Sequence, residues 1–210
     1  MSIQLLNCDC MEYMATQPDN AFDLAIVDPP YNICSQQKRG IGSRIDKTGK
    51  MNEWNHKNPD PEYFDHLFRI SENQIIWGAN NYIMPPSEYF CIWNKKQTVD
   101  NFAMAEYAWV SMGLKKPEKV FEYSIQQHNS DHSGGYKIHP TQKPVKLYEW
   151  LLTNYSKPGQ RILDTHLGSG STAIAAHYFG CDFVGCEIDK DYYDAAVNRF
   201  NNETAQEALF

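Results

Sequence analysis

Short apolar runs alternate with amphipathic stretches along most of this chain. Runs rich in apolar and β-branched side chains predict strands, whereas apolar positions that recur every three or four residues predict helices. Strands are expected at 3–6, 24–27, 74–77, 89–93, 119–125, 161–163 and 183–186. Helices are expected at 11–16, 61–70, 103–112, 141–155, 172–179 and 192–200. This alternation predicts an α/β fold in which helices cover both faces of a mixed, mostly parallel sheet.

Two polar stretches, 32–58 and 126–137, interrupt the alternation. Loops longer than about 15 residues are usually functional or disordered. Between Cys34 and Asn58, six basic residues stand against two acidic ones. This local excess of positive charge favours contact with the phosphates of a nucleic acid. The residues expected to make that contact are Lys38, Arg39, Arg44, Lys47 and Lys50.

Length and composition agree with one compact domain, since the chain has 210 residues and a hydrophobic content of 42%. The net charge of −7 means that any nucleic-acid contact must rest on local basic clusters. Six cysteines without a C-x-x-C pair predict a reduced, cytoplasmic protein and no metal site. No apolar run reaches the roughly 18 residues of a membrane span, and no signal-peptide layout is present, so no membrane contact is expected.

Two motifs carry the most information. The first is Asp28-Pro29-Pro30-Tyr31, which directly follows the apolar run 22–27. In the second, the expected strand 161–163 leads through Asp164 into a turn with Gly168-Ser169-Gly170 and then into a helix. A strand, a glycine turn and a helix in this order hold adenosine-type cofactors in α/β proteins. Glu187 follows about twenty residues later, at the end of the next strand, where an acid is expected to bind ribose hydroxyls.

In this order, with the Asp28 motif before the glycine turn, the chain resembles the amino-methyltransferases that use S-adenosylmethionine. It is similar to the permuted β-group of DNA adenine methyltransferases over nearly its whole length. The resemblance implies a circularly permuted, Rossmann-like methyltransferase fold in a single domain, 1–210. Within it, 1–31 would begin the catalytic part, 32–58 and 126–137 would contact DNA, and 139–200 would bind the cofactor.

The resemblance implies methyl transfer to N6 of adenine in DNA, with a catalytic segment made of Asp28, Pro29, Pro30 and Tyr31. The lone pair of an exocyclic amine is delocalised into the ring, so the amine is a poor nucleophile. Acceptors that hold its hydrogens favour a tetrahedral nitrogen, and the Asp28 carboxylate and the Pro29 carbonyl can supply them. The prolines stiffen the segment, and Tyr31 can stack on a base that has left the duplex.

The family's cofactor contacts can be carried over onto several segments. Asp9-Cys10 matches the position that contacts the cofactor adenine. The run 139–144 resembles the motif that would hold the methionine carboxylate near a helix N-terminus. Asp164 would meet the methionine amino group, and His166, which replaces the family's usual aromatic residue, would line the pocket. The full set is Asp9, Cys10, His139, Thr141, Lys143, Asp164, His166, Gly168, Ser169, Gly170, Ser171, Thr172 and Glu187.

Other functions stay open at this point. Cytosine N4 is an amine with similar electronics, although that branch more often has serine in place of Asp28. A second alternative is methylation of RNA or of a protein amide, and a third is a non-catalytic DNA-binding subunit that keeps the fold. His128 and His132 have a metal-compatible spacing but no recognisable cysteine or carboxylate partner. The region 93–138 is short for a DNA-reading domain, which favours a homodimer with an enlarged DNA footprint.

Overall fold

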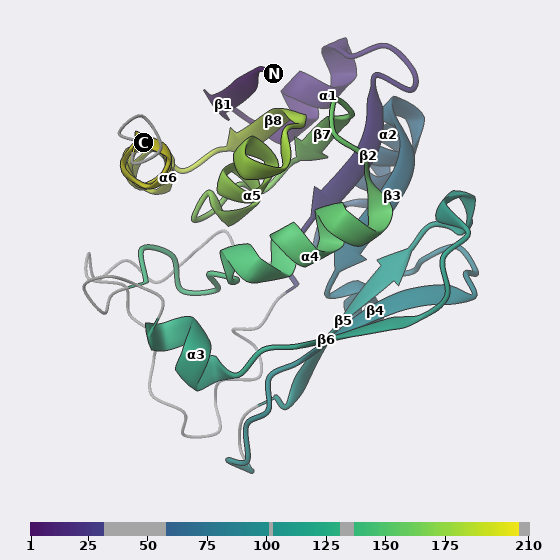
Figure 1. Cartoon of the computed structure of the whole chain (residues 1–210). Helices are drawn as coiled ribbons and strands as arrows, with labels where there is room; N and C mark the ends of the chain where they lie inside the picture. The colour runs from purple at the N-terminus through teal and green to yellow at the C-terminus, as the bar shows by residue number, and fades with distance from the viewer. Residues whose placement is uncertain (32–57, 101–102, 131–136, 206–210) are drawn as a thin grey trace.

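The structure is a computed structural model that describes residues 1–31, 58–100, 103–130 and 137–205. Its strands form one eight-stranded sheet in the order β1-β8-β7-β2-β3-β5-β4-β6 (Figure 1). Among these strands, β5 alone runs antiparallel to its neighbours, and the other neighbouring pairs are parallel. The predicted α/β class is therefore confirmed. The strands are β1 Ile3–Asn7, β2 Phe22–Val27, β3 Ser71–Trp77, β4 Tyr89–Asn94, β5 Ala105–Val110, β6 Lys119–Glu122, β7 Arg161–Asp164 and β8 Asp182–Glu187.

Helices cover both faces of the sheet (Figure 1). One face carries α1 Cys10–Thr16 and α2 Pro61–Ile70. The other carries α4 Val145–Tyr155, α5 Ser171–Phe179 and α6 Lys190–Thr204. Shorter elements are α3 Ile125–Ser130 and the 3-10 turns η3 Ala79–Asn81 and η4 Met112–Leu114. Within the described ranges, no helix is both long enough and apolar enough to cross a bilayer.

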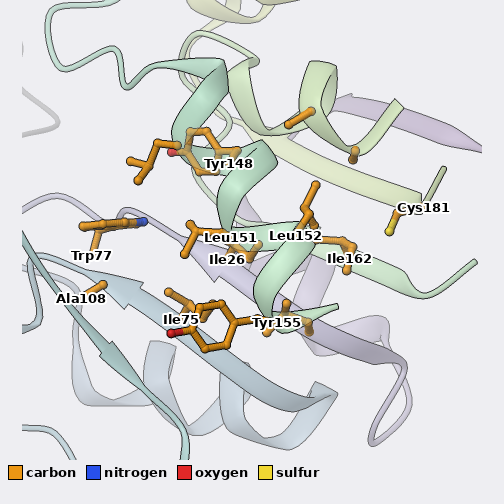
Figure 2. Packing of buried hydrophobic residues seen from close by; sticks show 14 of the residues in the cluster. Ile26, Ile75, Trp77, Ala108, Tyr148, Leu151, Leu152, Tyr155, Ile162 and Cys181 are labelled. Carbon is orange, nitrogen blue, oxygen red and sulfur yellow. The ribbon is translucent and has the colours of Figure 1, made fainter. Parts of the chain in front are cut away.

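The sheet divides the core into two apolar layers, because successive side chains of a strand point to opposite faces. In β3, Ile75 and Trp77 belong to the layer beneath α4, whereas Ile76 belongs to the layer beneath α1 and α2. Helix α4 turns Leu151 and Leu152 toward the sheet (Figure 2). Both leucines are fully buried, and each burial contributes about 1.5–3 kcal/mol. This packing fixes the segment that precedes α4 relative to the ends of β2 and β7.

Residues 103–112 do not form the predicted helix. They form β5 and then η4, so the sheet gains a strand that the sequence did not predict. Ala108 and Val110 lie in one apolar layer and Trp109 in the other, which is the period of a strand. The run is buried on both faces, and such a run carries apolar side chains at consecutive positions, as a buried helix does. Hydrogen bonding to β3 and β4 decides the outcome.

Two boundaries also differ from the predictions. The polar stretch 126–137 overlaps α3, since Ile125–Ser130 is helical and 131–136 lies outside the described residues. The helix predicted at 141–155 begins only at Val145. Pro144 occupies its N-cap, and a proline disfavours the helical conformation in the residue before it. The segment 139–144 is therefore a non-helical lead-in to α4, and it begins with a turn in which the Gln142 N–H donates to the His139 carbonyl at 3.1 Å.

Candidate functional site

The order of the strands brings together segments that are far apart in the sequence. Strands β1, β8, β7 and β2 are parallel neighbours, so their carboxyl ends lie in a row at one edge of the sheet. These four ends carry, in the same order, Asp9, Glu187, the turn 165–170 and Asp28. With strands about 4.8 Å apart, the row spans roughly 14 Å. Open α/β sheets bind ligands beyond this edge.

A cavity of about 250 Å³ lies at this row. Many of the predicted site residues line it: Asp9, Cys10, Asp28, Pro30, His139, Thr141, Lys143, His166, Gly168, Ser169 and Glu187. Gln142, within the predicted run 139–144, also lines the cavity. Further lining residues lie outside the predicted set: Cys8, Tyr148, Thr165, Leu167, Cys186 and Ile188. Most of these adjoin a predicted residue in the chain, so the motifs could have been extended to them. Tyr148 is a buried residue of α4 and carries no such signal.

The remaining predicted residues of the described chain do not line the cavity: Pro29, Tyr31, Asp164, Gly170, Ser171 and Thr172. Asp164 is 2% exposed, and its Oδ1 accepts a hydrogen bond from the His166 backbone N–H at 3.0 Å. Burial raises the pKa of Asp164 to about 7. The Ser171 hydroxyl donates to the Lys143 carbonyl at 2.8 Å and so ties α5 to the lead-in of α4. These side chains shape the turn, and a direct contact between Asp164 and the cofactor stays a prediction.

The glycine turn depends on backbone conformations that favour glycine. Gly168 has φ +52° and Gly170 has φ +74°, both in the left-handed region. The Gly168 N–H donates to Oε2 of Glu187 at 2.8 Å, which attaches the turn to β8. From α6, Nη1 of Arg199 donates to the Ser169 carbonyl at 3.0 Å. The turn is thus held from two sides while its backbone faces the cavity without a Cβ at Gly168.

Glu187 and His166 present polar groups to the cavity. Oε1 of Glu187 accepts a second backbone N–H, from Asp189 at 3.0 Å, and burial raises the pKa of the carboxyl group. The His166 Nδ1 lies 2.9 Å from the Thr165 hydroxyl, which in turn lies 2.6 Å from the Tyr63 hydroxyl. Burial lowers the pKa of His166 to about 4, so the ring is neutral at pH 7. The neutral His166 ring can donate or accept a hydrogen bond with a ligand, and it adds no charge to the cavity.

The Asp28 segment is supported by residues that the sequence did not single out. The Tyr82 hydroxyl donates to the carbonyls of Pro29 and Pro30, at 2.7 and 3.0 Å. A carbonyl oxygen has two lone pairs, so the Pro29 carbonyl can accept a second hydrogen bond. Gly78 has φ +67°, and a Cβ there would lie 2.6 Å from Cδ1 of Tyr31. Gly78 therefore allows the Tyr31 ring to lie directly on the backbone that follows β3.

The Asp28 carboxylate is buried within a group of charges. Its Oδ2 accepts a hydrogen bond from the Lys143 ammonium, whereas its Oδ1 is buried and has no hydrogen-bond partner among the described residues. Burial raises the pKa of Asp28 above its ordinary value, and the Lys143 cation opposes that rise. Burial and the same cation lower the pKa of the neighbouring His139 to about 4. The carboxylate therefore offers one unused oxygen at the end of the row opposite Asp9.

Comparison with known proteins identifies the family. The model of a family described as DNA methylase, N6_N4_Mtase, matches residues 47–198, which is more than half of the chain. The chain belongs to this DNA methylase family. S-adenosylmethionine is the cofactor of the family, which confirms the cofactor that the sequence predicted. The range matched by the family model begins after Tyr31, so the Asp28 segment lies outside it.

Individual relatives of this DNA methylase share about a quarter or less of its sequence. Type II methyltransferase M.HinfI of Haemophilus influenzae is 27% identical over 93% of the chain and 67% of its own length. The putative methylase YubD of Escherichia coli is 25% identical over 91% of the chain and 87% of its own length. The M1.HpyAVI–SAM complex has a TM-score of 0.59 at 18% identity, covering 94% of this chain and 99% of its own. PvuII DNA methyltransferase, described as cytosine-N4-specific, has a TM-score of 0.63 at 14% identity, covering 98% and 91%. These likenesses confirm the methyltransferase fold.

The residues predicted to bind DNA, Lys38, Arg39, Arg44, Lys47 and Lys50, lie outside the described part of the methylase. Among the described lysines, Lys95 is 14% exposed and forms an ion pair with Glu106. Lys96 is more exposed and pairs with Glu122. Both are at least partly neutralised, which makes them weaker candidates for phosphate contacts. In the described ranges, no group of three His, Cys, Asp or Glu side chains is arranged to hold a metal ion.

Proposed function

We propose that this DNA methylase transfers the methyl group of S-adenosylmethionine to N6 of an adenine that has swung out of duplex DNA. The proposal rests on Oδ1 of Asp28, a buried acceptor without a described partner in a carboxylate that borders the cavity. Leaving such an acceptor unpaired costs about 1–3 kcal/mol. An amino hydrogen of the target base would supply the missing partner.

The residues of the cavity suit the cofactor. When bound, S-adenosylmethionine supplies a methyl group on a positively charged sulfur, which is a strong electrophile. The Glu187 carboxylate can accept hydrogen bonds from the ribose hydroxyls, since its two oxygens have about four lone-pair sites and the backbone N–H groups of Gly168, Ile188 and Asp189 do not use all of them. Gly168 lines the cavity, and the absence of a side chain there would let a ligand approach the backbone closely. His139, Thr141 and Gln142 line the wall that precedes α4 and would hold the amino-acid part.

The chain then contributes orientation and electrostatics to the transfer. Asp28 Oδ1 and the Pro29 carbonyl would accept the two amino hydrogens and turn the nitrogen lone pair toward the methyl group. Asp28 would also stabilise the positive charge that develops on that nitrogen. Tyr31 would stack on the extruded base. We assign Asp28 as an orienting and stabilising group, because its Oδ2 is already paired with the Lys143 ammonium and its Oδ1 is the oxygen without a described partner.

Adenine is preferred over cytosine because the cytosine branch of the family more often has serine at the position of Asp28. The likeness to the cytosine-N4-specific PvuII enzyme is one of fold at 14% identity and does not separate the two bases. Both targets are exocyclic amines that a carboxylate can orient, so direct product analysis must decide between them.

The test is incubation of the protein with methyl-labelled S-adenosylmethionine and unmethylated bacterial genomic DNA, followed by nucleoside analysis. We expect N6-methyladenine from the wild type and at least about 100-fold less from Asp28→Asn. N4-methylcytosine as the product would replace adenine by cytosine in the proposal. No label in DNA, together with DNA binding, would identify a non-catalytic subunit, and label in RNA or protein would redirect the search for a substrate.

A further inference from the structure

Lys143 is buried where a lysine needs specific partners. Its side chain is 3% exposed, and its ammonium lies between Oδ2 of Asp28 and Oε2 of Glu106, 3.2 Å from the latter. It also lies 5.6 Å from the centre of the Trp77 ring. The resemblance to the family places this lysine among the cofactor-binding residues. Its described ion pairs instead connect it to the catalytic segment.

The ion pairs continue beyond Lys143. Glu106, on β5, also pairs through Oε1 with Lys95, which follows β4. The result is a row of alternating charges, Asp28, Lys143, Glu106 and Lys95, contributed by four separate segments. Burial alone would raise the pKa of Glu106, but the two ammonium groups outweigh it and hold that pKa at about 2. Burial would likewise lower the pKa of Lys143, but its two carboxylates raise it well above its usual range.

Stability is a weak explanation for such a row. Taking charges out of water costs several kcal/mol for each ion, and well-packed apolar residues often replace buried ion pairs without loss. One end of the row is Asp28 of the catalytic segment, and a functional role for the charges explains this position better than a contribution to stability does.

We propose that Lys143 is a positioning residue for Asp28, holding Oδ2 so that Oδ1 is the oxygen left for the target amine, while Glu106 and Lys95 hold Lys143 in place. This inference rests on the proposed function, since it assigns the second oxygen to that amine. An ammonium has three donors, and two of those of Lys143 point to carboxylates of the protein. A carboxylate that is fixed by one oxygen keeps a defined orientation, which a geometry-dependent transfer requires.

The row also favours the ionised form of Asp28, because the Lys143 cation opposes the rise in its pKa that burial causes. Without Lys143, Asp28 would be a buried carboxylate facing the Glu106 carboxylate, and both burial and that repulsion raise its pKa. An opposite charge at close range lowers a carboxyl pKa by about 1–3 units. The other titratable groups that face Asp28 from neighbouring elements are Lys95, Tyr82, Tyr148 and Asp164.

The first measurement needs neither cofactor nor DNA. The Asp28 carboxyl group is titrated by ¹³C NMR, with its signal assigned from Asp28→Asn. Lys143→Met should raise the titration midpoint by about 1–3 pH units. Glu106→Gln should lower the midpoint or leave it in place, because it removes a like charge. Lys146→Met is the matched control, because Lys146 is an exposed lysine three residues after Lys143, in the first turn of α4, and pairs with Glu149. It should change nothing.

In Lys143→Met the carboxylates of Asp28 and Glu106 face each other without a cation, and this variant can fail to fold. A second pair of variants, which avoids this repulsion, therefore repeats the test. Glu106→Gln/Lys143→Met removes one charge of each sign, and its Asp28 midpoint is compared with that of Glu106→Gln alone. A higher midpoint in the double variant supports the positioning role. An equal midpoint in both comparisons overturns it.

Binding and turnover separate the two roles of Lys143. A positioning residue predicts that Lys143→Met changes the dissociation constant of S-adenosylmethionine by less than about threefold. Turnover should fall at least about 100-fold, with its acid limb moved upward together with the Asp28 midpoint. Weaker cofactor binding with an unmoved midpoint would assign Lys143 to the cofactor and overturn the inference. A wild type that methylates no DNA would refute the proposed function instead, and the titration would still decide whether Lys143 positions Asp28.

Discussion

Asp28 and Glu187 stand near opposite ends of one row of strand ends, so single substitutions should separate the two halves of the reaction. Asp28→Asn keeps the shape of the side chain but removes its charge. We expect turnover to fall about 10²- to 10³-fold, because a stabilising group aimed at the developing charge is removed. Asp28→Ala should abolish turnover.

For both Asp28 variants, the affinity for S-adenosylmethionine should change little, since Asp28 is placed at the target amine. Calorimetry and a methylation assay on the same preparations measure the two quantities. Asp65→Asn, an exposed carboxylate on α2, is the control and should behave as the wild type. Near-normal turnover of Asp28→Asn would remove Asp28 from the mechanism.

Glu187→Ala should show the reverse behaviour. The predicted loss is about 1–3 kcal/mol of cofactor binding, the usual cost of losing hydrogen bonds to a charged acceptor. Part of the loss comes from Gly168, whose N–H would lose its acceptor on Glu187. Glu187→Gln keeps one carbonyl acceptor and should lose less, and Glu72→Ala on β3 serves as an exposed control. A dissociation constant that stays unchanged in Glu187→Ala would mean that another acid binds the ribose.

Asp164 predicts a pH dependence of stability. Its folded pKa of about 7 is raised above its unfolded value by burial, so the folded state prefers the neutral form. The stability associated with that form is fully present below the unfolded pKa of about 4 and is lost as pH rises through 7. Asp164→Asn removes this loss and keeps an acceptor for the His166 N–H.

The free energy of unfolding of Asp164→Asn minus that of the wild type should therefore increase by up to a few kcal/mol between pH 4 and pH 8. Urea titrations of both proteins across this range measure the difference. The titrations of His139 and His166 are common to both proteins and cancel in it. A difference that does not vary with pH would contradict the raised pKa.

At the scale of elements, the turn after β3 supports the catalytic segment. Gly78→Ala would place a Cβ against the Tyr31 ring and force a left-handed φ on a non-glycine residue. We expect a loss of about 1–2 kcal/mol of stability from the backbone and, in addition, weaker DNA binding and lower turnover from the displaced ring. Gly159→Ala is a matched control, since Gly159 has φ +84° and nothing within 4 Å of its Cβ position. Equal activity in the two variants would mean that Tyr31 tolerates the displacement.

The sequence predicted the helices and strands whose start or end is determined by residues next to them in the chain. β2 and β7 end in motifs with their own turn chemistry, and α2 begins with Pro61 at its first turn. β5 could not be predicted, because an apolar run such as Tyr107-Ala108-Trp109-Val110 becomes a strand only by pairing with β3 and β4. The site residues divide in the same way, into those that a neighbouring motif predicts and those that only the tertiary fold brings in. Adjacency to motifs predicted most of the cavity, whereas Glu106 reaches Lys143 only through the position of β5.

At the scale of the whole molecule, a net charge of −7 must be reconciled with a polyanionic substrate. Simultaneous replacement of Lys38, Arg39 and Arg44 by alanine should weaken DNA binding and flatten its salt dependence. The log–log slope should fall by up to about 0.9 for each phosphate that the variant no longer neutralises. Cofactor binding should survive, because the cavity is lined by other segments.

The measurement is DNA affinity against salt concentration for the wild type and the triple variant. Replacing Lys115, Lys116 and Lys157 instead removes the same charge from exposed positions of the described surface and should leave the slope unchanged. Parallel lines for the wild type and the first variant would refute a role for the 32–58 stretch. A reduced slope in the second variant would move the DNA footprint to Lys115 and Lys116.

The pairing of β1 with β8 sets an order of events during synthesis on the ribosome. Ile3 lies opposite Phe183, so β1 has no strand to join until β8 has been made. At 5–20 residues per second, that interval is roughly 10–40 s. A nascent chain meanwhile keeps its first apolar strand unpaired, as a ready ligand for chaperones, and lacks Glu187 from the cofactor cavity. Chains whose translation stops before β8 should therefore bind S-adenosylmethionine poorly.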